Sequence, residues 1–182
     1  MNIDLFLQNL KKHGIENEIP NISEVNARFL RDLIKIAKTQ NMLEIGTANW
    51  YSAINFALEL NETQGKLTTI EFSKLSYDQA LMNFEHAWVS NTIHAINGNA
   101  LDIIPSLAET YDFVFIDGMK RRTKDFLELV RDKVESGWII IIDDVIKFRE
   151  KMIWFWEYLD DNKIKYNIIP IDIDDGIVMI VK

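Results

Sequence analysis

The chain has 182 residues, of which 48% are hydrophobic and 26% are charged, the proportions of an ordinary globular protein. It contains no cysteine, which excludes disulfides, thiolate metal sites and thiol nucleophiles. The formal net charge of −8 disfavours non-specific nucleic-acid binding, which needs clustered Lys and Arg, and KRRTK at 120–124 is the only candidate basic patch.

No segment approaches the roughly 20 apolar residues that span a bilayer. The N-terminal stretch MNIDLFLQNLKKHG also lacks the apolar region of a signal peptide. We therefore expect no membrane association and a cytoplasmic location.

Apolar residues recur at helical spacing and in short continuous runs that alternate along the chain. Helices are predicted over 23–38, with Ser23 as N-cap, and over 51–60, 74–88, 101–109, 122–135 and 149–163. Between them, strands are predicted over 41–46, 66–71, 92–97, 111–117 and 137–143.

Continuous apolar strands that alternate with amphipathic helices are typical of a parallel sheet covered on both faces. The last two runs, 165–171 and 176–182, are joined through DIDDG at 172–176, which is too short for a parallel crossover, so they should form an antiparallel hairpin. We predict one α/β domain with a doubly wound, Rossmann-like, mostly parallel sheet over residues 21–182, preceded by a short helical extension over 1–20.

Acidic residues stand at or beside the ends of four of the five predicted parallel strands: Glu44, Glu71, Asp117 and the pair Asp143–Asp144. Ligands of open α/β sheets bind beyond the carboxyl ends of the strands, so this arrangement points to a binding site. Helix N-capping alone would explain one or two of these acids without any ligand. Glu71 follows the glycine turn LEIGTANWYS by about 25 residues, where dinucleotide-type folds bind ribose hydroxyls.

These residues carry a family resemblance. The motifs MLEIGTANWYS, TTIE, NGNALDIIPSL, YDFVFIDGMK and GWIIIIDDV have the order and spacing of class I S-adenosylmethionine-dependent methyltransferases. More narrowly, the chain resembles the cation-dependent O-methyltransferases over about residues 20–182. The resemblance implies an enzyme that transfers a methyl group from S-adenosylmethionine to a hydroxyl, assisted by Mg²⁺, Mn²⁺ or Ca²⁺.

The resemblance also implies roles for individual residues. Gly46, Thr47 and Ser52 would lie near the methionine part of the cofactor, Glu71 would hold the ribose diol, and Glu44 and Asp117 would lie beside them. The adenine would be lined by Gly98, Asn99 and Ala100. Asp117, Asp143 and Asp144 match the divalent-metal ligands, and Lys120 matches the catalytic base, with Asp117 beside it.

This chemistry needs a deprotonated oxygen held in line with the methyl carbon. Carboxylates are the hard oxygen donors that suit such cations, and a cation lowers the pKa of a bound hydroxyl. Lys120 lies three residues after Asp117, and we expect its pKa to fall close to a metal ion.

Three departures from the family pattern stand out. Trp50 replaces a glycine, and its indole would shield the cofactor, stack on the substrate or block the site. Asp144 replaces an asparagine and adds a negative charge. The chain segments that would cover the substrate are short. They leave an open pocket rimmed by Lys120, Arg121, Arg122 and Lys124, which suits a larger or anionic acceptor.

Two alternative hypotheses remain open. One is a metal-independent methyltransferase of the same fold, and the other is a non-catalytic module whose crevice is filled by Trp50. The expected partner is a small hydroxylated acceptor; tRNA is an alternative that the net charge does not favour, and a homodimer would complete the open pocket.

Overall fold

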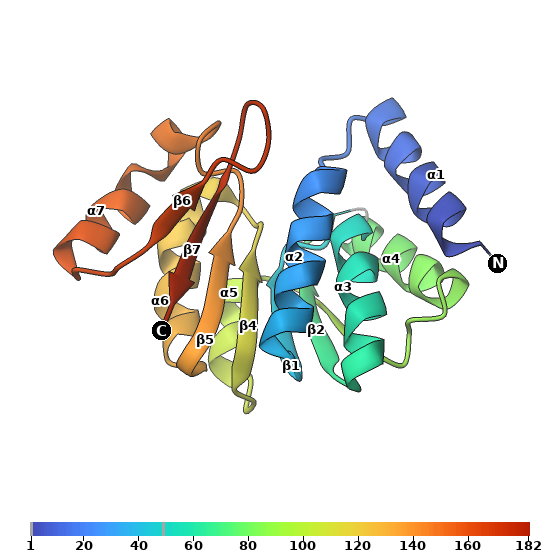
Figure 1. Cartoon of the computed structure of the whole chain (residues 1–182), viewed down its shortest axis with the longest axis horizontal. Coiled ribbons are helices and arrows are strands. Elements are labelled where there is room, and N and C mark those ends of the chain that lie inside the picture. The colour runs from blue at the N-terminus through green and yellow to red at the C-terminus, as the bar shows by residue number, and fades with distance from the viewer. Residues whose placement is uncertain (1, 49) are drawn as a thin grey trace.

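The computed structural model describes residues 2–48 and 50–182, except for the side chains at 135 and 136. Within this part of the chain, seven strands form one sheet in the order β3-β2-β1-β4-β5-β7-β6 (Figure 1). The strands are β1 (Asn41–Ile45), β2 (Lys66–Glu71), β3 (Ile93–Asn97), β4 (Tyr111–Ile116), β5 (Val134–Ile142), β6 (Asn167–Ile169) and β7 (Ile177–Val181). The first five are parallel, while β7 is antiparallel to both β5 and β6, which confirms the predicted doubly wound α/β sheet and its terminal hairpin.

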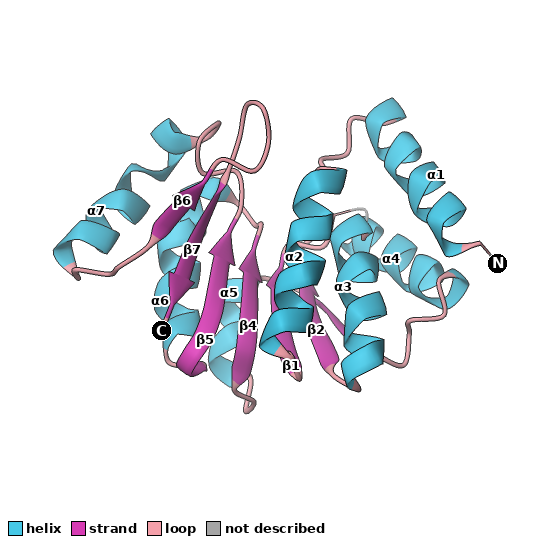
Figure 2. Cartoon of the chain, viewed as in Figure 1, coloured by secondary structure: helices cyan, strands magenta, loops and turns pink. Residues whose placement is uncertain are grey.

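Helices cover both faces of the sheet, as Figure 2 shows. They are α1 (Ile3–Glu16), α2 (Glu24–Ala37), α3 (Tyr51–Thr63), α4 (Lys74–His86), α5 (Ala100–Ile103), α6 (Thr123–Arg131) and α7 (Ile153–Asp161), with 3₁₀ turns η1 (Ile104–Ser106), η2 (Lys120–Arg122) and η3 (Arg149–Met152). The Ser23 side chain accepts a hydrogen bond from the Asn26 N–H at 2.9 Å, as its predicted role of N-cap requires.

Neighbouring residues of each strand enter different cores. Met42 of β1 and Phe113 and Phe115 of β4 pack with α1 to α4, whereas Leu43 and Val114 pack with α5, α6 and α7. This alternation follows from the period of two in a strand, and it explains why most positions of the central strands are apolar. The buried sheet therefore fixes where its carboxyl ends lie.

Several predicted boundaries were wrong. The helix expected over 122–135 ends at Arg131, and β5 begins at Val134 rather than at 137, because Val134 pairs with Tyr111. The register then shifts before Phe113 pairs with Ile139. The helix expected over 101–109 is also shorter, with α5 ending at Ile103 and η1 at Ser106. The division at residue 20 stays a prediction, although Leu7 and Leu10 of α1 are buried in the core shared with α3.

Candidate active site

The turn after β1 brings the backbone close to the end of β4. Gly46 has φ +94°, and a Cβ at this position would lie 2.5 Å from the carbonyl oxygen of Asp117. A side chain would meet immovable backbone there, so the sequence needs glycine. The turn is consequently held beside the carboxyl end of β4.

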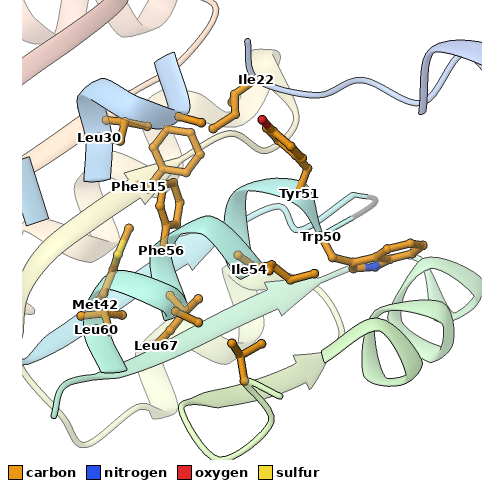
Figure 3. Packing of buried hydrophobic residues seen from close by; sticks show 14 of the residues in the cluster. Ile22, Leu30, Met42, Trp50, Tyr51, Ile54, Phe56, Leu60, Leu67 and Phe115 are labelled. Atoms are coloured by element: carbon orange, nitrogen blue, oxygen red, sulfur yellow. The ribbon is translucent and has the colours of Figure 1, made fainter. Parts of the chain in front are cut away.

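Trp50 closes the same turn without entering the crevice. It adopts a left-handed conformation with φ 75°, which explains why glycine is expected at this position. Its side chain is only 3% exposed, and the indole Nε1 donates a hydrogen bond to the Ser76 carbonyl at 2.8 Å. Figure 3 shows the indole directed toward helix α4. Trp50 is not one of the described residues that line the cavities at the strand ends. Its side chain therefore does not block the crevice.

Glu71, at the end of β2, holds the turn from the other side. Its Oε2 accepts hydrogen bonds from the backbone N–H groups of Thr47 at 3.1 Å and Ala48 at 3.0 Å, while Oε1 accepts one from Ser73 at 2.7 Å. The carboxylate also lines the adjoining cavity. Glu71 thus combines a structural role with a position at which a ligand's hydroxyl groups could reach it.

Glu44 lies at the centre of a buried hydrogen-bond network below the turn. It is fully buried and accepts hydrogen bonds from the hydroxyls of Ser52 and Thr69, each at 2.6 Å. The Thr69 hydroxyl also lies 2.5 Å from that of Thr47. Burial raises the pKa of the Glu44 carboxyl to about 8, although the two hydroxyl donors oppose this shift.

A cavity of about 580 Å³ lies at the carboxyl ends of β1, β2 and β4. It brings together most of the residues assigned to cofactor binding, namely Gly46, Glu71, Gly98, Asn99, Ala100 and Asp117. Three assigned residues, Glu44, Thr47 and Ser52, lie buried beneath the turn and are not among the described residues that line the cavity. Their contact with a cofactor stays a prediction.

Three carboxylates meet at the ends of β4 and β5. Asp117, Asp143 and Asp144 each offer one oxygen within 4.8 Å of the others. Sequence reasoning missed their neighbour Asn26 on α2, whose Nδ2 donates to Asp143 Oδ1 at 2.9 Å. No local signal marks this amide, since 117 residues separate the two partners.

The electrostatics of this cluster favour a cation. Burial, together with the carboxylates of Asp117 and Asp144, raises the pKa of Asp143 well above its usual value. Burial and Asp117 likewise raise the pKa of Asp144 to about 6, against the opposing effect of Lys120. Crowded oxygen donors of this kind fit Mg²⁺, Mn²⁺ or Ca²⁺, whose charge would offset their mutual repulsion.

Lys120 supplies one positive charge within the cluster. Its Nζ lies 2.6 Å from Asp117 Oδ1 and 2.9 Å from Asp144 Oδ2. Burial lowers its pKa, but these two carboxylates outweigh that effect and raise the pKa above its usual value. The expectation that a bound metal ion lowers this pKa stays a prediction.

The loop between β6 and β7 organises the turn that follows Asp144. Asp175 is buried, and its Oδ1 accepts hydrogen bonds from the N–H groups of Ile146 at 3.1 Å, Lys147 at 3.2 Å and Gly176 at 2.7 Å. A Cβ on Gly176 would lie 2.6 Å from the Ile169 carbonyl. The DG pair of DIDDG was interpreted only as a hairpin turn, so the sequence reasoning missed this contact.

A second cavity, of about 740 Å³, lies on the other side of the carboxylates. It shares Asp117, Gly118 and Met119 with the first cavity and is also lined by Asp143, Asp144 and Lys120. The expected basic rim is only partly right. Arg121 lines this cavity, but Arg122 pairs with Asp125 at 3.0 Å and Lys124 pairs with Glu128 at 3.5 Å. Lys147 and Lys151 line it instead.

No helix in the described part of the chain is long and apolar enough to cross a membrane.

Comparison with known proteins gives consistent matches to methyltransferases. The chain is 31% identical over 133 residues to the catechol O-methyltransferase of Mycobacterium tuberculosis. The aligned region covers 71% of this chain and 60% of that protein. It is 30% identical over 125 residues to caffeoyl-CoA O-methyltransferase 5 of Nicotiana tabacum, covering 65% of this chain and 52% of the relative. The chain thus spans between half and two-thirds of the length of these curated relatives.

Solved structures agree over almost the whole chain. The Bacillus cereus O-methyltransferase in complex with SAH superposes with a TM-score of 0.85 at 25% identity, covering 97% of this chain and 90% of that one. The SAM complex of TomG from Streptomyces achromogenes has a TM-score of 0.86 at 22% identity, covers 97% of this chain and 89% of that one, and supports the fold alone. The O-methyltransferase family profile matches residues 3–182, and the chain therefore belongs to the O-methyltransferase family.

Proposed function

We propose that this chain is an S-adenosylmethionine-dependent O-methyltransferase, assisted by a divalent cation, that methylates a hydroxyl of a small molecule. The observation that carries the proposal is the pair of adjoining cavities that share Asp117. One has Gly46, Glu71 and Asn99 in its wall, and the other opens on the three carboxylates.

Each part of the reaction has residues suited to it. When bound, S-adenosylmethionine would supply the electrophilic methyl carbon, and the cation would favour the deprotonated form of the acceptor hydroxyl. Glu71 and Asn99 would bind and orient the cofactor from the strand ends. Asp117, Asp143 and Asp144 would hold the cation, and Asn26 would orient Asp143 through its 2.9 Å hydrogen bond.

Transfer to a hydroxyl releases one proton, and Lys120 Nζ is the nearby group proposed to take it. In the structure its pKa is raised by Asp117 and Asp144, which favours the charged form that cannot accept a proton. Lys120 is therefore expected to act as a base only when a cation takes up the charge of these carboxylates.

A metal-independent methyltransferase is the second candidate, and the position of Lys120 favours it. Its ammonium lies within 2.9 Å of two carboxylates and already provides a positive charge among them. A divalent cation would have to displace this group or share the carboxylates with it.

Calorimetric titration with S-adenosylhomocysteine, in Mg²⁺ and again in EDTA, tests the cofactor assignment. We expect micromolar binding in both conditions and about 10- to 100-fold weaker binding for Glu71→Gln, because a charged acceptor for the ribose hydroxyls is lost. Glu85→Gln removes an exposed acid from α4 and serves as the matched control. Failure of the wild-type protein to bind in either condition would refute the proposal.

Methyl transfer to 3,4-dihydroxybenzoate then separates the two candidates. If the proposal is right, EDTA and Asp143→Asn both abolish turnover while S-adenosylhomocysteine binding persists. Turnover that survives both treatments would establish the metal-independent reaction instead.

A further inference from the structure

The second cavity combines an apolar wall with cationic side chains that form no ion pair, although Glu18 and the three carboxylates at the strand ends line it as well. Among the described residues, Arg121, Lys147 and Lys151 line it and have no salt-bridge partner within 4.0 Å, unlike Arg122 and Lys124 nearby. The protein as a whole carries a formal net charge of −8, so unpaired cations gathered around one cavity oppose the overall charge.

The two lysines are arranged around an aromatic ring. Lys151 Nζ lies 4.6 Å from the centroid of Phe148, and Lys147 Nζ lies 5.7 Å from the same centroid. Phe148 lines the cavity as well. A flat apolar body against this ring would bring a negatively charged substituent within reach of both ammonium groups.

The position of this cluster relative to the carboxylates is fixed by the fold. Asp144 and Lys147 lie on the same turn, whose backbone N–H groups at Ile146 and Lys147 donate to the buried Asp175. The Val145 N–H donates to the Gly176 carbonyl at 3.0 Å. Because the β6–β7 loop clamps the turn in this way, the backbone of Lys147 is held at a set distance from the carboxylate cluster.

We propose that Arg121, Lys147 and Lys151 form an anion subsite that binds a carboxylate or phosphate group on a hydroxylated aromatic acceptor. This inference rests on the proposed function and extends it to the class of substrate. The acceptor's hydroxyl would face Asp117 and Asp144, its ring would pack on Phe148, and its anionic group would lie between the cations.

Three acceptors of matched shape test the subsite: 3,4-dihydroxybenzoate, 3,4-dihydroxybenzyl phosphate and the uncharged 3,4-dihydroxybenzyl alcohol. Their binding is measured by calorimetry with S-adenosylhomocysteine and Mg²⁺ present, and their kcat/KM with S-adenosylmethionine. For the double variant Lys147→Gln/Lys151→Gln, we expect binding of the anionic acceptors to weaken about 10- to 100-fold, since hydrogen bonds to charged groups are lost. The uncharged acceptor should change less than about twofold, and Lys124→Gln, whose lysine pairs with Glu128 outside this cavity, should change none of them.

The outcomes separate this inference from the proposed function. Equal loss of all three acceptors, or no preference of the wild-type protein for the anionic ones, would overturn the subsite even if S-adenosylhomocysteine binds. If the carboxylate and the phosphate acceptor both bind more weakly to the double variant, the result supports a general anion subsite. If only one of them binds more weakly, its anionic group is identified as the ligand. Displacement of all three acceptors by an RNA hairpin, lost in the double variant, would overturn the small-molecule assignment in favour of a nucleic-acid acceptor.

Discussion

Replacing Trp50 with glycine tests whether its indole supports the fold or obstructs the crevice. The side chain is 3% exposed and donates to the Ser76 carbonyl, so its removal should cost about 3–5 kcal/mol of unfolding free energy through lost packing. Glycine at φ 75° relieves about 1–2 kcal/mol of left-handed strain and adds about 0.5–1 kcal/mol of unfolded-chain entropy. Urea denaturation should therefore show a net loss of about 2–4 kcal/mol.

Trp88 provides a matched control, because it also has a positive φ, of 60°, yet is 79% exposed. Trp88→Gly should leave stability within about 1 kcal/mol of wild type or raise it slightly, since strain relief is not opposed by lost burial. S-adenosylhomocysteine affinity should change little in Trp88→Gly and should not improve in Trp50→Gly. The reasoning would be refuted if Trp50→Gly were as stable as wild type and bound S-adenosylhomocysteine at least tenfold more tightly.

Three further predictions concern residues around the site. The folded protein keeps the Glu44 proton up to about pH 8 whereas the unfolded chain releases it near its ordinary pKa of 4.5, so stability should fall between these values by up to about 1.4 kcal/mol per pH unit. Glu44→Gln should remove this component, seen as a shallower pH dependence of urea unfolding; an unchanged slope would contradict it. Gly46→Ala would press a Cβ against the Asp117 carbonyl. It should abolish S-adenosylhomocysteine binding, measured by calorimetry, and lower the unfolding free energy by about 2–4 kcal/mol, measured by urea unfolding. Near-normal binding would contradict the tight turn. Asp175→Ala leaves three backbone donors without their acceptor and should raise the KM for acceptors at least tenfold with S-adenosylhomocysteine affinity intact, whereas a parallel loss of both would indicate general unfolding.

Local sequence patterns were sufficient to predict most of the architecture. Continuous apolar runs require a sheet buried on both faces, and the short DIDDG connection requires antiparallel pairing of the last two strands. Parallel strands end at one edge, so the acids after β4 and β5 had to meet there, as Asp117, Asp143 and Asp144 do. Boundaries were less predictable, because β5 begins at Val134 through pairing with Tyr111 and not through any local preference.

Contacts between distant segments were decided only by the tertiary structure. The sequence left Trp50 with three alternatives, and packing against α4 placed its indole outside the crevice. The hydrogen bond from Asn26 to Asp143 and the clamp of Asp175 on the turn at Lys147 join residues that no short motif connects. The sequence by itself determines periodicity and the residues at strand ends because these are local properties of the chain. Which side chains share a buried contact depends on how the helices and loops pack over the sheet, and only the folded chain contains that information.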